Sequence, residues 1–197
     1  MKKMVSVFLA LVLALGLCSA FAEEAALPAY TWTGDDPVTA AVIKYMQETD
    51  SGYETPEGGI LIPTPIILKT DLNAEETEAS VYGNFWIFTY ARNGKILERA
   101  ACGENPGVIR LEKKDGEWAV ISAEFAEDGE EAYNASIKKF ANGDKELEEQ
   151  YYCTTGATED SFLPQYQRAA VVEYVVANGL DIEAFQEPGR DPVSVID

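Results

Sequence analysis

The side chains that could carry chemistry in this sequence are carboxylates, tyrosines, arginines and thiols, because the chain contains no histidine. Ser-His-Asp and Cys-His nucleophile systems, His-ligated zinc and imidazole acid–base catalysis are therefore excluded. Two carboxyl groups about 5–10 Å apart could cleave a glycosidic bond, and Glu98, Glu112 and Glu124 lie on predicted strands. With 34 acidic residues in the chain such a pair also arises by chance. The alternative is a solvated acidic face.

A row of aromatic side chains is the second candidate. Tyr82, Trp86, Phe88 and Tyr90 share one face of a predicted strand. As an open surface, this row could stack on sugars or grip a peptide. As a covered surface, it would be core beneath the first or the last helix.

Two arginines stand out in so acidic a chain. If Arg99 and Arg110 point into one cavity, their guanidinium groups could hold a carboxylate or phosphate ligand. Otherwise each pairs with a neighbouring strand acid such as Glu98 or Glu112. The ligand-binding residues that the sequence predicts are Tyr82, Trp86, Tyr90, Arg99 and Arg110.

The N-terminus predicts export. Lys2 and Lys3 precede the uncharged, apolar stretch 4–17, and small residues then lead to Ala22. This pattern is typical of a signal peptide over residues 1–22, cleaved after Ala22. The apolar stretch is shorter than the roughly 20 residues that span a bilayer. Lipidation at Cys18 is the alternative, although a leucine stands where lipidated proteins have a small residue. We expect a secreted, periplasmic or cell-surface protein.

Charge limits the partners of the mature protein. Loss of Lys2 and Lys3 lowers the 15 basic residues to 13 against 34 acidic ones, so the net charge falls from −19 to −21. Such a surface repels nucleic acid and anionic lipid. We expect a small molecule, a glycan or an extracellular protein as partner, no nucleic acid, and no stable membrane insertion after signal cleavage.

Two cysteines remain after cleavage. Cys102 and Cys153 are an even number in an exported chain, which favours a disulfide. The alternative is a pair of buried thiols, and no imidazole is present to activate either one. No calcium-loop motif of the D-x-[DN]-x-[DN]-G type supports calcium capture by the acidic residues. We expect no metal and no cofactor.

The elements that must position these side chains are a helix, a run of strands and further helices. Asp35 or Asp36 can cap a helix that starts at Pro37, and apolar residues then recur at helical spacing to residue 49. Segment 78–92 is apolar on both faces, as a central strand is. Asn93-Gly94 and Asp115-Gly116 predict hairpins, and a turn is expected over 103–107. Helices are expected over residues 130–140, 144–151 and 161–178.

This order predicts an α+β fold in which an N-terminal helix packs on a four- to five-stranded antiparallel meander, followed by two or three C-terminal helices. One domain is expected over residues 23–185, and residues 186–197 are expected to form a loose tail.

Three segments carry a resemblance. They are Val81-Tyr82-Gly83-Asn84-Phe85-Trp86, Gly107-Val108-Ile109 and Tyr174-Val175-Val176-Ala177-Asn178-Gly179. Over roughly residues 36–180 the chain resembles cystatin-like and nuclear-transport-factor-like cone-shaped folds, and small exported bacterial proteins with no assigned activity. The Gln-x-Val-x-Gly hairpin of the protease-inhibitor members is absent.

Three functions stay open. The sequence favours a non-catalytic, exported domain that binds a small molecule, glycan or protein. The alternatives are a carboxylate-dependent hydrolase or lyase, with its site in the concave sheet, and a peptidase-inhibitor-like interaction protein.

Overall fold

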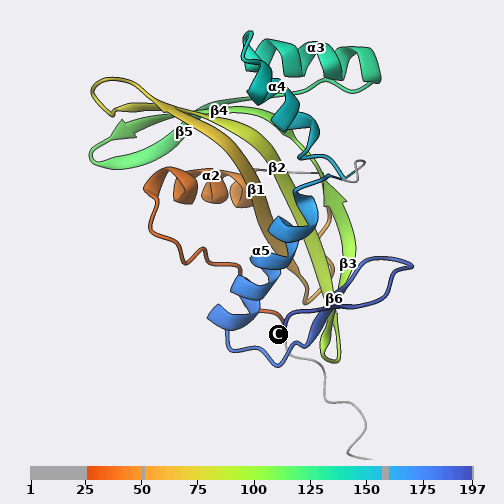
Figure 1. Ribbon diagram of the computed structural model, residues 1–197. Helices are drawn as coiled ribbons and strands as arrows, with labels where there is room; N and C mark the ends of the chain where they lie inside the picture. Colours follow the sequence, from red (N-terminus) through yellow and green to blue (C-terminus); the bar gives the residue numbers. More distant parts are fainter. Residues whose placement is uncertain (1–25, 50–51, 157–159, 197) are drawn as a thin grey trace, which may run out of the picture.

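The computed structural model describes residues 26–49, 52–156 and 160–196. The predicted signal peptide 1–22 and Cys18 lie outside these residues. The described chain is α+β, which confirms the predicted class, and it has four helices and a mixed seven-stranded sheet (Figure 1). The sheet therefore has more strands than the four to five expected.

The elements follow the chain in the order helix, five strands, three helices and two short strands. They are α2 (Pro37–Glu48), β1 (Ile60–Leu72), β2 (Glu78–Asn93), β3 (Ile96–Gly103), β4 (Pro106–Lys114), β5 (Glu117–Phe125), α3 (Glu130–Ala141), α4 (Lys145–Tyr152), α5 (Leu163–Ala177), β6 (Ala184–Gln186) and β7 (Val193–Ser194).

Helix α2 begins where the sequence predicts. The Asp36 carboxylate accepts the backbone N–H groups of Val38 and Thr39, and Pro37 occupies the first turn, where its missing N–H costs nothing. Burial raises the pKa of Asp36, but the hydrogen bonds from Thr39 and Val38 outweigh it, and the net pKa is lowered.

Strand β2 is the central strand of the sheet. Strand β1 pairs with it along one edge, while β4 and β3 share the other edge, β4 at its start and β3 at its end. The pairs Ile87↔Gly103 and Asn84↔Pro106 belong to one continuous register. Strands β3 and β4 are thus one long antiparallel partner of β2 with a two-residue interruption.

The prediction of a turn over residues 103–107 is therefore wrong, because the chain continues along β2 there. Glycines and an asparagine favour a turn, but here Asn105 keeps contact with β2. Its side-chain amide donates to the Phe85 carbonyl at 3.2 Å, and its backbone carbonyl accepts the Phe85 N–H at 3.1 Å. Gly107 is required because a Cβ there would lie 2.2 Å from the Glu124 carbonyl.

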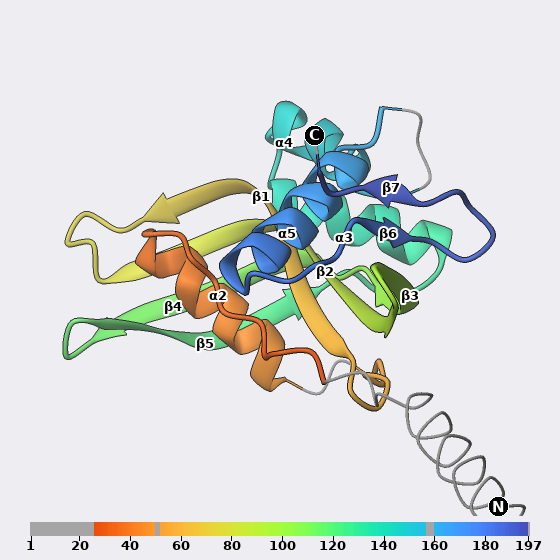
Figure 2. The same cartoon turned by 90° about the horizontal axis from the view of Figure 1, so that it is seen from below.

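The two strands beyond the predicted number come from the end of the chain. Strand β6 pairs with β3 in parallel, and β7 returns antiparallel to β6, next to α5 (Figure 2). The sequence predicts a loose tail over 186–197, yet Val193–Ser194 belongs to the sheet and Val195 is buried. The sequence did not predict β6 and β7, because segments this short carry little sequence pattern. The parallel pairing of β6 is also made with β3, a strand far away in the chain.

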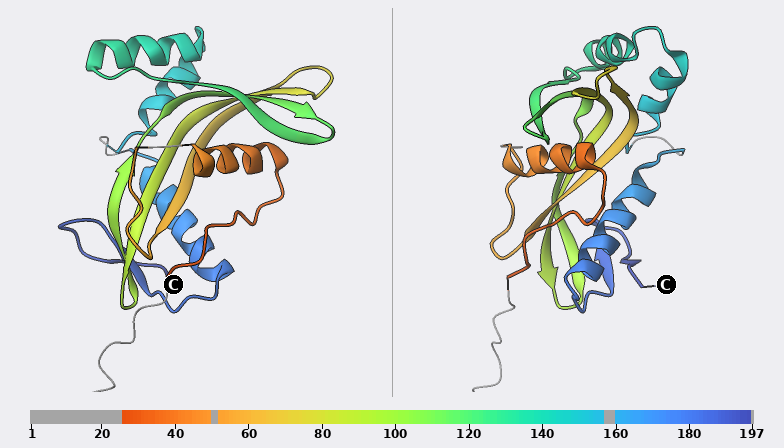
Figure 3. Two further views of the ribbon diagram at one scale, coloured as in Figure 1. Left: turned by 180° about the vertical axis from the view of Figure 1, so that it is seen from behind. Right: turned by 90° about the vertical axis from the view of Figure 1, so that its left-hand side faces the viewer.

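Both faces of β2 are covered, by different helices. Val81, Phe85 and Ile87 pack with the residues of α2, whereas Trp86 and Tyr90 pack with those of α5. Figure 3 shows α2 and α5 on opposite sides of the sheet. Helices α3 and α4 enclose a third cluster beside β4.

The segment before α2 lies against α5. Tyr30 stacks on Tyr174 with ring centroids 6.3 Å apart, and the Tyr174 hydroxyl donates to the Pro28 carbonyl at 2.8 Å. The Thr33 hydroxyl donates to the Glu173 carboxylate at 2.7 Å. The first described residues are thus part of the same core cluster as the last helix.

Candidate functional site

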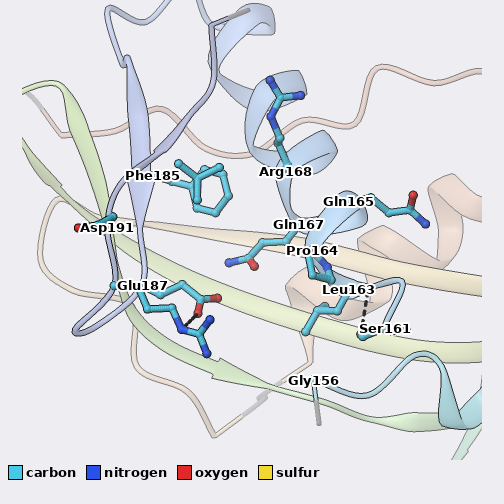
Figure 4. A pocket seen from close by; sticks show the side chains of 12 residues that line it. Gly156, Ser161, Leu163, Pro164, Gln165, Gln167, Arg168, Phe185, Glu187 and Asp191 are labelled. Carbon is cyan, nitrogen blue, oxygen red and sulfur yellow. Dashed lines mark hydrogen bonds and ion pairs between the residues drawn. The ribbon is translucent and has the colours of Figure 1, made fainter. Parts of the chain in front are cut away.

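A cavity of about 680 Å³ lies between the start of α5 and the β6–β7 segment (Figure 4). This volume falls within the range of small-molecule sites. The residues that line it are Gly156, Ser161, Leu163, Pro164, Gln165, Gln167, Arg168, Phe185, Glu187, Arg190, Asp191 and Val193.

One wall of the cavity is apolar. Leu163 and Phe185 are buried and belong to the core cluster that includes Trp86. Val193 is 41% exposed, so it forms part of the rim. An apolar group of a ligand would therefore rest directly on the core of the protein.

A neutral polar pair lies behind this wall. Gln167 on α5 is only 4% exposed, and its side-chain amide donates to the Tyr90 hydroxyl at 3.0 Å. Burial raises the pKa of Tyr90, and the hydrogen bond from Gln167 opposes that rise only in part. The hydroxyl therefore stays protonated at neutral pH, and the pair offers hydrogen bonds without charge.

Charged groups also line the cavity, on both the β6–β7 segment and α5. Glu187 follows β6, and its carboxylate lies between two guanidinium groups: Arg99 Nη1 is 3.0 Å from Oε1, and Arg190 Nε is 3.4 Å from Oε2. The guanidinium of Arg168 donates through Nε to the Ser194 carbonyl at 3.2 Å. These contacts hold the segment between β6 and β7 against β3 and α5.

The aromatic row predicted from the sequence lies mostly inside the protein. Phe88 and Tyr90 are fully buried, and Trp86 is 7% exposed. The Trp86 and Phe88 rings stack at 5.6 Å, and the Trp86 indole N–H donates to the Thr154 carbonyl at 2.9 Å. Tyr82 is half-buried on the α3–α4 side. This placement agrees with the alternative in which the aromatic row is part of the core.

The two predicted arginines do not meet. Arg110 is exposed on β4, in register with Ser80 and Ser122. Of the predicted residues, Arg99 reaches the cavity through Glu187, Tyr90 adjoins it through Gln167, and Trp86 lies beside Gly156 of its lining.

Sequence reasoning missed the residues that build the cavity: Gln167, Arg168, Glu187 and Arg190. The available signal was that two of the five arginines of the chain lie close to its C-terminal end, at 168 and 190. Arg190 lies in the segment that was predicted to be a loose tail, so it was not considered as a site residue.

Cys102 and Cys153 are free thiols in the structure, not the two halves of the expected disulfide. Cys102 lies on β3 and contacts the α5-side core, and Cys153 caps the end of α4. Both are half-buried.

The three acids considered for catalysis have separate surroundings. Glu98 accepts a hydrogen bond from Asn93, Glu124 forms an ion pair with Lys139, and Glu112 is exposed on β4. Among residues 26–49, 52–156 and 160–196, no group of three Cys, Asp or Glu side chains could hold a metal ion.

A buried polar junction lies where β3 passes into β4. Asn84 is fully buried, and its amide donates to the Thr154 hydroxyl at 3.1 Å and to Glu104 at 3.3 Å. Burial raises the pKa of Glu104, and the hydrogen bond from Asn84 opposes the rise. Burial and the nearby Glu104 charge raise the pKa of Tyr133 to about 12. The junction ties the α4–α5 connection to the sheet.

Comparisons with protein-family models, with curated proteins and with solved structures find no match to this chain. None of the described helices is long and apolar enough to cross a bilayer.

Proposed function

We propose that the protein is a non-catalytic, exported binding domain whose small-molecule ligand occupies the cavity between α5 and the β6–β7 segment. The observation that carries this proposal is the combination, in one cavity, of apolar side chains with a buried hydrogen-bonding pair and ion-paired charges. Small-molecule sites usually combine apolar walls with a few polar groups that orient the ligand.

The proposed location rests on the sequence. A basic start, an apolar stretch and small residues before Ala22 support export. The strongly acidic composition supports a small molecule, glycan or extracellular protein as partner, rather than nucleic acid.

The proposed architecture is an N-terminal helix laid on an antiparallel meander. Contacts of α2 with residues of β1, β2 and β5 support it, and they also support the resemblance to cystatin-like and nuclear-transport-factor-like folds. A peptidase-inhibitor role has no comparable support, because the inhibitor hairpin motif is absent.

The test uses a neutral, environment-sensitive dye, Nile red, and a variant that fills the cavity. We expect the dye to bind with enhanced fluorescence, and Val193→Trp to weaken its binding at least about tenfold, or ~1.4 kcal/mol. Val193 lines the cavity yet is partly exposed, so the larger side chain can enter the cavity without disturbing the core.

The matched control is Ile121→Trp on β5, where the side chain is 60% exposed and remote from the cavity lining. It should leave the dye affinity within about twofold of the original. Absence of dye binding, or equal effects of the two substitutions, would overturn the proposed site.

A further inference from the structure

We infer that the ligand is an organic anion, a carboxylate with an apolar body, and that Glu187 competes with it for Arg99 and Arg190. This inference rests on the proposed function, since it names the chemistry of the ligand at the same cavity.

The charge around the cavity differs from that of the whole chain. The sequence has 34 acidic residues against 15 basic ones. The cavity lining has two of each, and the neighbouring cavity adds one of each, Arg99 and Glu98, so the charges there are balanced. In a protein whose overall charge repels anions, this wall is a local exception.

The geometry of this wall suits a carboxylate. Arg99 and Arg190 approach the two oxygens of one carboxylate, Oε1 at 3.0 Å and Oε2 at 3.4 Å. Guanidinium groups favour carboxylates through paired, charge-assisted hydrogen bonds. Glu187 therefore demonstrates, with the protein's own side chain, that the two arginines accommodate a carboxylate here.

Glu187 has room to move aside. Its side chain is about a quarter exposed, at 23%. It lines both the main cavity and a neighbouring cavity of about 290 Å³ that Arg99 and Gly189 also line. The space beside it lets its side chain leave the arginines when an incoming carboxylate replaces it, although Glu98, which also lines the second cavity, makes full entry there unfavourable.

The apolar part of the same ligand would lie against Leu163 and Phe185. Figure 4 shows the Phe185 ring and the Leu163 side chain on the sides of the cavity, with Glu187 and the Gln167 amide directed into it. A ligand with one charged end and an apolar body matches both the arginines and the apolar side chains, whereas a purely polar anion matches the arginines only.

The first experiment compares three ligands that share an eight-carbon chain: octanoate, octanol and octylamine, each titrated as a competitor of Nile red. We expect octanoate to displace the dye at a concentration at least tenfold lower than either of the others. The preference should shrink with added salt, because it comes from partly exposed charges. Equal potency of the three, or a preference for octylamine, would overturn the inference and leave the proposed function standing.

The second experiment tests competition by Glu187. Glu187→Gln should raise the affinity for octanoate severalfold, and Arg190→Gln should lower it at least fivefold without changing the affinity for octanol. Asp191→Asn is the matched control, because it removes the same charge from the same cavity lining without removing a carboxylate from the arginines.

The outcomes of the two experiments are distinct. If Glu187→Gln and Asp191→Asn raise the octanoate affinity equally, the effect is general electrostatics and Glu187 is not a competitor. If Nile red binds and Val193→Trp blocks it while no octanoate preference appears, only the ligand class is wrong. If the dye does not bind at all, the proposed function fails first. Thermal unfolding of each variant verifies that it is folded.

Discussion

The two faces of β2 are built from alternate residues of one strand, yet they differ in chemistry. Toward α2, Val81, Phe85 and Ile87 form an apolar cluster with the residues of that helix. Toward α5, Trp86 and Tyr90 are equally buried but carry hydrogen bonds, to Thr154 and Gln167. The α5 face also continues into the cavity, since Leu163 and Phe185 belong to both. The α2 face also borders a cavity, a smaller one of about 190 Å³ that Phe85 and Ile87 line. Burial and a cavity therefore do not distinguish the two faces; the buried polar partners do.

The largest effect is expected when a buried side chain on the α2 face is shortened. Phe85 is 1% exposed, and Phe85→Ala should lower the free energy of unfolding by about 3–5 kcal/mol through lost burial and the cavity left behind. Urea unfolding measures the loss. The variant that remains folded should keep the Nile red binding that Val193→Trp weakens, because Phe85 lines a separate cavity on the α2 face.

Phe125→Ala is the control for Phe85→Ala. The two rings are in edge contact at 6.1 Å, but Phe125 is 36% exposed, so its removal should cost less than half as much. Reduced dye affinity in folded Phe85→Ala would contradict the division between the two faces.

A smaller effect is expected on the α5 face. Tyr90→Phe keeps the ring but leaves the Gln167 amide without its acceptor, and a buried, unsatisfied donor costs about 1–3 kcal/mol. Urea unfolding should show this loss, and dye affinity should also change, because Gln167 lines the cavity.

The double variant Tyr90→Phe/Gln167→Leu tests whether the loss in Tyr90→Phe comes from its hydrogen bond with Gln167. Its loss of unfolding free energy should be smaller than the sum of the two single losses, since the pair acts as a unit. Strict additivity would show that the hydrogen bond contributes nothing.

The smallest effect is expected at Glu104, and it depends on pH. Because burial raises the pKa of Glu104 in the folded protein, ionisation of this carboxyl opposes folding. The stability that its neutral form contributes is fully present below the pKa of the same glutamate in the unfolded chain. That contribution is lost as the pH rises through the raised pKa of the folded protein. Glu104→Gln should therefore become more stable, relative to the original protein, as the pH rises above about 4.3, the ordinary pKa of a glutamate.

Urea unfolding at several pH values measures this gain. Glu112→Gln, an exposed acid on β4, controls for the loss of one negative charge from an acidic protein. If both substitutions give the same pH profile, the polar junction around Asn84 does not penalise the charge on Glu104.

The helices and hairpins could be predicted because their signals are local. Asp36 and Pro37 mark the start of α2, and Asp115 and Gly116 form the β4–β5 turn with the positive φ angles that such turns need. The alternation in residues 78–92 correctly indicated a strand covered on both faces.

What could not be predicted depends on partners distant in the chain. Gly103 and Gly107 favour a turn locally, but pairing with β2 holds the chain extended. The cavity could not be predicted for the same reason. Strand β6 has only three residues and is positioned by its pairing with β3, about 90 residues earlier. Glu187 and Arg99 can be matched only once that pairing is known.

The contact between the segment before α2 and α5 has a consequence for the order of assembly. Thr33 and Glu173 are 140 positions apart, and Pro28 and Tyr174 are 146 positions apart. Loops that long close slowly, so the α5-side core is expected to consolidate late. The domain cannot be completed while its C-terminal quarter is still missing, and a nascent chain emerging from a ribosome would stay open until its last helix is released.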